Sequence, residues 1–207
     1  MSAAQSGSDE APPGPSGRGT REQLVAAASR LLAEGGVGAV TLRAVGERAG
    51  VSRSAPYRHF EDKNDLLVAV LLETFRKFFQ DMEAEMSATP MTTPEMLRRG
   101  FRGYVRFGLA WPEHYLLMFS DRKVHVDKGD LAEVAPKGLD FFQEIITKGQ
   151  RAGELRSGDA REMTLLTWSA LHGLVTLGVS DHLKSKGVDT EEALDRLVAE
   201  LVAGLEA

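Results

Sequence analysis

The sequence predicts an all-α protein of about nine helices, with a unit of three short helices followed by a larger helical region. From Thr20 onward, apolar residues recur at helical spacing, and no run of β-branched and aromatic residues alternates at period two. The chain has 207 residues, 43% of them hydrophobic, which is enough for a substantial core. It has no cysteine, which excludes disulfides, Cys-based zinc fingers, iron–sulfur clusters and thiol nucleophiles.

Two features argue against a membrane or secreted protein. The longest uninterrupted apolar run, Leu66 to Leu72, falls well short of the roughly 20 residues that span a bilayer. Residues 1–17 contain no Lys or Arg and no apolar segment, so they do not form a secretory signal. Because they consist mostly of Ser, Gly, Ala and Pro, we expect them to form a disordered tail.

Start and stop signals delimit the first three helices, within residues 18–63. Thr20 and Gln23 have the spacing of a capping box, and Gly35 and Gly36 end the helix that begins there. A second helix begins at Thr41 and stops at Gly50, and a third runs from Ser52 to near Phe60. The apolar residues expected to hold the three together are Leu24, Ala27, Ala28, Leu31, Leu32, Leu42, Val45, Ala49 and Val51.

Six more helices are expected in residues 64–207. The first opens at Asp62, with Asp65 three residues later, and runs towards Met86 until residues 89–94 break it. Pro112 marks a helix boundary, and Asp159 and Asp189 are suitable N-caps for the last two helices. The remaining predicted helices span residues 93–110, 112–120, 131–151, 159–184 and 189–205.

Charge is distributed unevenly along the chain. Residues 18–63 contain eight bases and five acids, a net charge of +3, whereas residues 64–207 contain 17 bases and 23 acids, a net charge of −6. A basic segment on an acidic protein is typical of a polyanion-binding module joined to a domain with another role. Chance variation of surface charge is the alternative.

The segment Thr41 to Phe60 reads TLRAVGERAGVSRSAPYRHF, two short helices joined at Gly50. A tight turn between crossing helices favours a residue that tolerates positive φ, which glycine does. A short, basic second helix suits the major groove of DNA, where Arg contacts a guanine edge. A helical hairpin with a solvated face is the alternative. The outward-facing residues of this helix are Arg53, Ser54, Tyr57 and Arg58.

Residues 49–67, AGVSRSAPYRHFEDKNDLL, closely resemble the signature of the TetR family, with its Ala-Gly-Val-Ser turn, Tyr-x-His-Phe and a Lys before a Leu-Leu pair. With the preceding helices, the resemblance covers residues 20–72. Trp168, His172 and Gly173 also resemble the Trp-His-Gly feature of one TetR subgroup. The resemblance implies a cytoplasmic, nucleoid-associated transcriptional regulator that binds double-stranded DNA, with no catalytic activity, no cofactor and no membrane partner.

The resemblance also implies roles for single residues. Hydroxyls, imidazole and helix N-termini bond phosphate oxygens, and base edges are read by charged and polar side chains. Pro56 stands where the family more often has an aliphatic residue, so we expect the recognition helix to begin late or with a distorted first turn. The phosphate-contacting candidates are Thr41, Tyr57, His59 and Lys63, and the base-contacting candidates are Arg53, Ser54 and Arg58. Arg18 and Arg21 are candidates for the backbone or minor groove, or else form a disordered cationic flank.

TetR-like proteins are typically homodimers whose last two long helices form a four-helix bundle. We assign the apolar stripes of these helices to that interface, with intramolecular core as the alternative. Two recognition helices about one helical turn apart, ~34 Å, require a palindromic operator. The interface candidates are Leu171, Val175, Val179, Leu194, Leu197, Val198, Leu201 and Leu205.

Aromatic residues with polar tips form the candidate effector pocket, because ring area gives affinity and polar tips give orientation. Core packing is the alternative for each. The candidate pocket residues include no Lys or Arg, which favours a small, largely apolar effector. A stripe of Arg98, Arg102 and Arg106 is interpreted as a solvated helix face, with an anion site as the alternative. The pocket candidates are Phe101, Tyr104, Trp111, Tyr115, Met118, Phe119, Phe142, Trp168 and His172.

No metal site or catalytic centre is predicted. The histidines form no HxxxH or HExxH pattern, and no GxSxG, P-loop or GxGxxG motif occurs. The rival hypotheses are a helical small-molecule carrier without DNA binding and an enzyme using His172 with a nearby carboxylate. The sequence therefore predicts a ligand-responsive regulator, most simply a repressor released from its operator by the effector.

Overall fold

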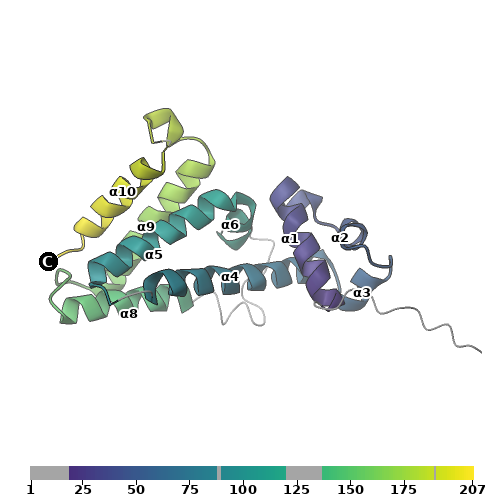
Figure 1. Ribbon diagram of the computed structural model, residues 1–207, viewed down its shortest axis with the longest axis horizontal. Helices are drawn as coiled ribbons and strands as arrows, with labels where there is room; N and C mark the ends of the chain where they lie inside the picture. The colour runs from purple at the N-terminus through teal and green to yellow at the C-terminus, as the bar shows by residue number, and fades with distance from the viewer. Residues whose placement is uncertain (1–18, 88–89, 120–136, 189) are drawn as a thin grey trace, which may run out of the picture.

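The computed structural model describes residues 19–87, 90–119, 137–188 and 190–207. Its regular elements are helices, which confirms the all-α prediction (Figure 1). The predicted tail, residues 1–17, lies outside the described residues, as does the start of the helix predicted at 131–151. The described ranges contain nine α-helices and one 3-10 turn: α1 (Thr20–Ala39), α2 (Leu42–Ala49), α3 (Ala55–His59), α4 (Lys63–Ser87), α5 (Thr93–Ala110), α6 (Pro112–Phe119), α8 (Lys137–Arg151), α9 (Ala160–Val179), η1 (Lys184–Lys186) and α10 (Glu191–Ala203).

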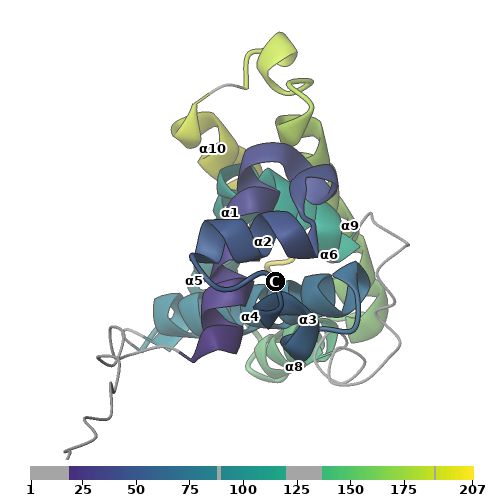
Figure 2. The same cartoon turned by 90° about the vertical axis from the view of Figure 1, so that its right-hand side faces the viewer.

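The helices form two packed groups that are joined by α4. In the first, which we call the head, α1 packs against α2 and α3. In the second, the body, α5 is central and packs against α6, α8, α9 and α10 as well as α4. Figure 1 shows the head at one end and α10 with the C-terminus at the other, and Figure 2 shows α1, α2 and α3 in front of the body. The long α4 therefore links the two groups.

Each group has its own hydrophobic core, and α4 contributes to both. Leu24 of α1 and Leu66 of α4 lie in the head core. Met82, further along α4, and Phe101 of α5 lie in the body core. The half-buried Phe107 of α5 packs against both cores. The 3.6-residue period of apolar positions along α4 buries one side of the helix over its whole length.

Side-chain caps start several helices as predicted. The Thr41 hydroxyl accepts a hydrogen bond from the Ala44 N–H at 3.1 Å, and the Asp159 carboxylate accepts one from the Glu162 N–H at 2.9 Å. Each satisfies an N–H group that the first helical turn leaves without a partner. For α10 the predicted cap, Asp189, lies outside the described residues, and Thr190 accepts from the Ala193 N–H.

The helix α1 begins at Thr20 as predicted, but its cap and its end differ from the prediction. Thr20 is the first helical residue, and the cap position belongs to Gly19, which has no side chain to bond the helix. Gly35 and Gly36 leave helical geometry as expected, but the chain resumes a short helical turn as far as Ala39. Gly36 has φ 64° and ψ −170°, a region open essentially to glycine alone, so the kink depends on this residue.

Two other boundaries also shift. The recognition helix α3 begins at Ala55 rather than Ser52, which is the late start expected from Pro56: the proline falls in the first turn, where its missing N–H has no intrahelical partner to lose. The helix predicted at 159–184 ends at Val179, because Asp181 adopts a positive φ of 58° and the chain turns into η1. A left-handed residue interrupts the helical hydrogen-bond ladder.

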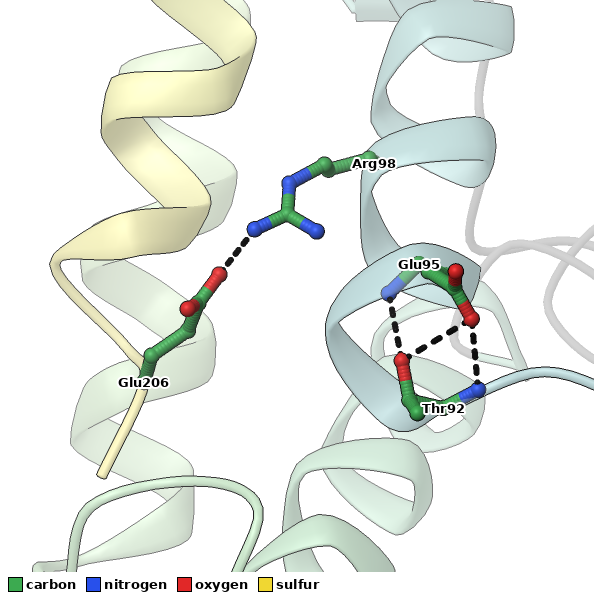
Figure 3. A network of polar contacts seen from close by, with 4 residues as sticks. All are labelled: Thr92, Glu95, Arg98 and Glu206. Atoms are coloured by element: carbon green, nitrogen blue, oxygen red, sulfur yellow. Dashed lines mark hydrogen bonds and ion pairs between the residues drawn. The ribbon is translucent and has the colours of Figure 1, made fainter.

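Three ion pairs fix α10 to α5. The arginine stripe that the sequence analysis interpreted as a solvated face is partly exposed, and it also meets two carboxylates of α10 and one of the C-terminal residues. Figure 3 shows the Arg98 pair beside the Thr92–Glu95 capping box that starts α5. Because the pairs are partly exposed, each contributes about 0–1 kcal/mol. The pairs are Arg98–Glu206, Arg102–Asp195 and Arg106–Glu191.

The close crossing of α5 and α9 depends on Gly108. A Cβ atom at this position would lie 2.3 Å from Cγ1 of Val175, which is fully buried in the body core. Any side chain on Gly108 therefore forces the two helices apart or pushes Val175 out of its packed position. The crossing brings α9 close enough to α5 for the polar contacts described below.

We expect Gly108→Ala to destabilise the protein by about 1–3 kcal/mol, the cost of overpacking a core. Gly103→Ala is the matched control, since nothing lies within 4 Å of a Cβ there on the same helix. That variant should be stabilised by about 0.5–1 kcal/mol through helix propensity. Chemical denaturation of both variants measures the difference; equal stabilities would contradict the close-packed crossing.

Candidate DNA-binding surface and effector pocket

The turn between α2 and α3 is built as the sequence predicts. Gly50 has φ 69° and ψ 27°, and its N–H and that of Val51 return to the last carbonyls of α2. A Cβ on Gly46 would lie 2.9 Å from Cγ of Pro56, so the proline ring packs directly on the α2 backbone. Pro56 is thus a buried packing residue that presses α3 onto α2.

This packing turns the other side of α3 and its preceding turn to the solvent. Ala55 and Pro56 are buried, as is Phe60 just beyond the helix. Tyr57 is 61% exposed, which is unusual for a large aromatic side chain and leaves its hydroxyl free to contact another molecule. The structure therefore brings the predicted base-reading and phosphate-contacting residues of this segment to one exposed surface: Arg53, Ser54, Tyr57, Arg58 and His59.

Thr41 and Lys63 flank this surface and are engaged within the head. The Thr41 oxygen accepts the cap hydrogen bond from Ala44, which leaves its hydroxyl hydrogen available for an outside acceptor. The ammonium group of Lys63 is half-buried and donates to the carbonyl of Val37, at the end of α1. Lys63 therefore ties the start of α4 to the end of α1.

Ion pairing separates the basic residues of the head into two classes. Arg48 makes two hydrogen bonds of 2.7 Å to Glu34, and these lower the pKa of that carboxyl. Arg43 pairs with Glu47 at 2.9 Å. Arg53 and Arg58 make no ion pair with any described residue. Paired guanidinium groups offer little to an outside anion, so Arg53 and Arg58 are more available to one than Arg43 and Arg48.

Arg21, near the start of α1, also lies close to the recognition helix. Its guanidinium carbon sits 5.2 Å from the centre of the Phe60 ring, a cation–π contact. The contact holds a positive charge at the C-terminal end of α3. Arg18 lies outside the described residues.

In the body, three polar tips from three helices meet inside an aromatic cluster. The Tyr104 hydroxyl lies 3.0 Å from Nε2 of His172 and 3.5 Å from the Tyr115 hydroxyl, which also hydrogen-bonds His172. The rings of Phe119 and Trp168 stand edge-on to His172 at centroid distances of 4.4 and 4.2 Å. We call these five residues the aromatic cluster; α5, α6 and α9 supply them.

Burial sets the protonation states in the aromatic cluster. It lowers the pKa of His172 to about 4 and raises the pKa values of Tyr104 and Tyr115. All three groups are therefore neutral near pH 7 and act as hydrogen-bond donors and acceptors without charge. A neutral polar centre lined with rings suits a mostly apolar ligand that carries a polar group.

The other predicted pocket residues lie elsewhere. Phe101 and Phe142 pack against each other beside the aromatic cluster, with ring centroids 5.6 Å apart, and a small gap separates them from Trp168. Met118 packs in the head core, and Trp111 lies 47% exposed over the opposite side of α6. The sequence reasoning also missed Phe78 of α4, whose ring meets Tyr104 at 5.7 Å. Its place in the apolar stripe of α4 was the available signal.

The predicted dimer residues mostly face the core of their own chain. Leu171, Val175, Val198 and Leu205 are buried there, and Val179, Leu194 and Leu201 pack against the same core. Among the eight, Leu197 is exposed, at 36%. The apolar stripe of α9 that was predicted to form the dimer interface faces α5. The opposite side of α9 exposes further apolar side chains to solvent. These exposed residues are Leu165, Leu166 and Leu177.

The described residues contain neither a membrane-spanning helix nor a metal-binding group. None of the described helices combines the length and hydrophobicity needed to cross a lipid bilayer. In the same ranges, no group of three or more His, Asp or Glu side chains is arranged to hold a metal ion.

A helix-turn-helix with an exposed basic recognition helix, mounted on a helical body with a polar-centred aromatic cluster, defines a DNA-binding transcriptional regulator. Residues 24–70 match the family model for bacterial regulatory proteins of the tetR family, and residues 97–201 match that for the tetracyclin repressor-like C-terminal domain. The chain belongs to the TetR family. The Trp-His-Gly subgroup assignment remains a prediction.

Individual relatives agree with this assignment. The fatty acid metabolism regulator protein of Bacillus subtilis is 25% identical over 167 residues, covering 78% of this chain and 84% of that protein. A Rhodococcus protein of unknown function has a structure with a TM-score of 0.81 and 27% identity, covering 92% and 97% of the two chains. The transcriptional regulator FadR from B. subtilis, solved with stearoyl-CoA, has a TM-score of 0.68 at 21% identity, covering 89% and 99%. The two B. subtilis proteins are named as regulators.

The depressed pKa of His172 predicts that the folded protein loses stability in acid. Below pH 6.5 the unfolded chain takes up a proton at this residue, and the folded protein does not until the pH approaches about 4, so stability falls across this window. Allowing for partial solvent screening, we expect His172 to account for a loss of about 1–2 kcal/mol between pH 7 and 4.5. Urea unfolding at both pH values, compared with His172→Gln, isolates this contribution. Equal losses in the two proteins would show that His172 is not buried in its neutral form.

Proposed function

We propose that the protein acts as a homodimeric repressor that binds a palindromic operator and is released by a largely apolar effector. The observation that carries this proposal is the exposed, unpaired basic surface of α3, connected through α4 to the body that holds the aromatic cluster. Family membership supports a ligand-responsive regulator; repression, the dimer and the effector class are proposed.

Arg53, Ser54 and Arg58 are proposed to read base edges in the major groove. Their exposure, and the lack of ion pairs to the two arginines among the described residues, support this role. Thr41, Tyr57 and His59 are proposed to contact phosphates, each through a group with a free donor. At Lys63 the proposed phosphate contact is made by the N-terminus of α4, because the Lys63 ammonium already donates to the carbonyl of Val37.

A second copy of the chain is proposed to cover the exposed side of α9. Leu166 is 69% exposed, Leu165 and Leu177 of the same helix are also exposed, and α10 adds the exposed Leu197. Leucines clustered in this way on a helix face are typical of a subunit interface. The buried stripe assigned from the sequence would then position α9 and α10 from within, without touching the partner.

The aromatic cluster is proposed as the centre of the effector site, with Phe101 and Phe142 at its side. Fatty-acyl compounds are the first class to test, because a relative is named as a regulator of fatty acid metabolism and a structural neighbour was solved with stearoyl-CoA. A long alkyl chain matches the aromatic walls, and its polar end group matches the neutral hydroxyls and imidazole.

Binding to DNA from the gene's own upstream region tests the proposal. A fluorescent fragment and a scrambled control are titrated at two salt concentrations, and acyl-CoA compounds of increasing length are then added to the complex. Selective, salt-dependent binding with two protomers per palindrome, reversed by an acyl-CoA, is the expected result. An absence of DNA binding even at low salt would leave the carrier hypothesis.

Substitutions on α3 and in the turn before it should distinguish phosphate contacts from base contacts. We expect Tyr57→Phe to weaken binding by about 1 kcal/mol for all sequences, through loss of one hydrogen bond to a phosphate. Arg53→Ala should cost about 1–3 kcal/mol on the operator and relax the preference at one base pair. Titration against single-base operator variants measures both. If Arg53→Ala weakens every sequence equally, Arg53 does not read a base.

A charge placed on the exposed side of α9 should break the dimer. In Leu166→Glu a carboxylate would be buried against the partner, and we expect dimer affinity to fall at least about tenfold. Gln80→Glu, an exposed position on α4, is the control for added charge. Sedimentation velocity over a dilution series measures the dissociation, and a variant as dimeric as the control would place the interface elsewhere.

A further inference from the structure

A separate cleft lies where the head meets the body. It has a volume of about 140 Å³ and opens between four helices. Ser29 of α1, Phe107 of α5, His114 of α6, and Trp111 between α5 and α6 contribute to its walls. The aromatic cluster takes Tyr115 and Phe119 from α6, whereas this cleft takes His114 from the same helix. The lining residues from α4 are Val70, Glu73, Thr74, Lys77 and Asp81.

The inner walls of the cleft are apolar and aromatic. Val70 and Phe107 come from the buried sides of their helices, and the Trp111 ring stands edge-on to His114 with centroids 5.5 Å apart and an interplanar angle of 84°. Trp111 nevertheless remains 47% exposed. The volume is close to that of a cavity of about 150 Å³ that accommodates benzene. The cleft thus has the size and walls for one aromatic ring.

The rim of the cleft is acidic. Lys77 pairs with Asp81 at 3.0 Å, so these two charges offset one another. Glu73 makes no ion pair with a described residue, so the charged residues that line the cleft carry one net negative charge. A carboxylate next to an aromatic face attracts an organic cation through Coulomb and cation–π interactions. A ligand with an anionic group would instead be repelled by Glu73.

The cleft also touches the contact between head and body. His114 is 4% exposed, and its Nε2 atom lies 2.8 Å from the Ser29 hydroxyl of α1. Its Nδ1 atom is buried without a hydrogen-bond partner among the described residues. An occupant would contact α1, α4, α5 and α6 together, and would favour one placement of the head relative to the body.

We propose that this junction cleft is a second effector site, for a small ligand with one aromatic ring and an ammonium group. Its occupation changes operator affinity, because any ligand that prefers one placement of the head shifts the equilibrium between placements. The effect on DNA rests on the proposed function, whereas binding to the cleft does not.

Fluorescence measures binding without DNA. The chain has two tryptophans, so Trp168→Phe leaves Trp111 as the single reporter. Phenethylamine is the probe, and 2-phenylethanol and 3-phenylpropionate are its neutral and anionic counterparts. We expect a saturable change with phenethylamine, half-complete below about 1 mM, and at least about tenfold weaker responses with the other two. A response that does not saturate, or that is equal for all three compounds, would overturn the proposal.

Variants then test the assigned contacts. Glu73→Gln should weaken phenethylamine binding about tenfold and leave 2-phenylethanol unchanged, whereas Asp140→Asn, an exposed acid on α8, should change neither. Unchanged unfolding midpoints show that both variants fold. If Glu73→Gln binds the amine as tightly as the parent, the ammonium does not bind at the proposed carboxylate, and the ligand class is wrong.

The regulatory part is tested on the operator complex. Phenethylamine should change operator affinity at least about threefold in the parent protein and not in Glu73→Gln. Fluorescence binding without any change in DNA affinity would refute the coupling. If the protein binds no DNA, the proposed function is contradicted. The fluorescence titration would still show whether the cleft binds the amine.

Discussion

The helix α4 has to satisfy two hydrophobic cores at once. Leu66 and Val70 lie in the head core, and Phe78, Met82 and Met86 lie in the body core. The helix has 25 residues, roughly 38 Å of length, and its sequence contains neither glycine nor proline. Without a residue that commonly kinks a helix, a displacement of its body half is carried to the head as a tilt of the whole rod. The contacts of α6 with α1 and α4 provide a second connection between the two groups.

Features that depend on a few neighbouring residues could be predicted from the sequence. The cap at Thr41 and the left-handed turn at Gly50 follow from local hydrogen bonding and from glycine's backbone freedom. The role of Pro56 could not be predicted fully, because it depends on the space that Gly46 leaves on a different helix. The cap expected at Thr20 does not form, because Thr20 is itself the first helical residue and the cap position falls on Gly19.

The body shows why helical spacing alone does not assign a site. In α6, Tyr115 and Phe119 are four residues apart and meet His172, whereas Met118 packs in the head core. Spacing places residues on a face, but only the packed structure shows what that face meets. The same limit applies to α9, which is apolar on two sides. A helix of this kind must be covered on both, and its sequence does not show which side the chain itself covers.

In the proposed effector site, the polar centre of the aromatic cluster limits which ligands fit. Tyr104, Tyr115 and His172 satisfy one another, and burying such groups without partners costs about 1–3 kcal/mol each. A purely hydrocarbon ligand that separates them would have to offset this cost with ring contacts alone. A ligand with one polar terminus can replace the broken hydrogen bonds and still bury its chain against Phe119 and Trp168. The geometry therefore favours an amphipathic effector whose polar end lies among the three neutral groups and whose apolar part displaces the surrounding rings.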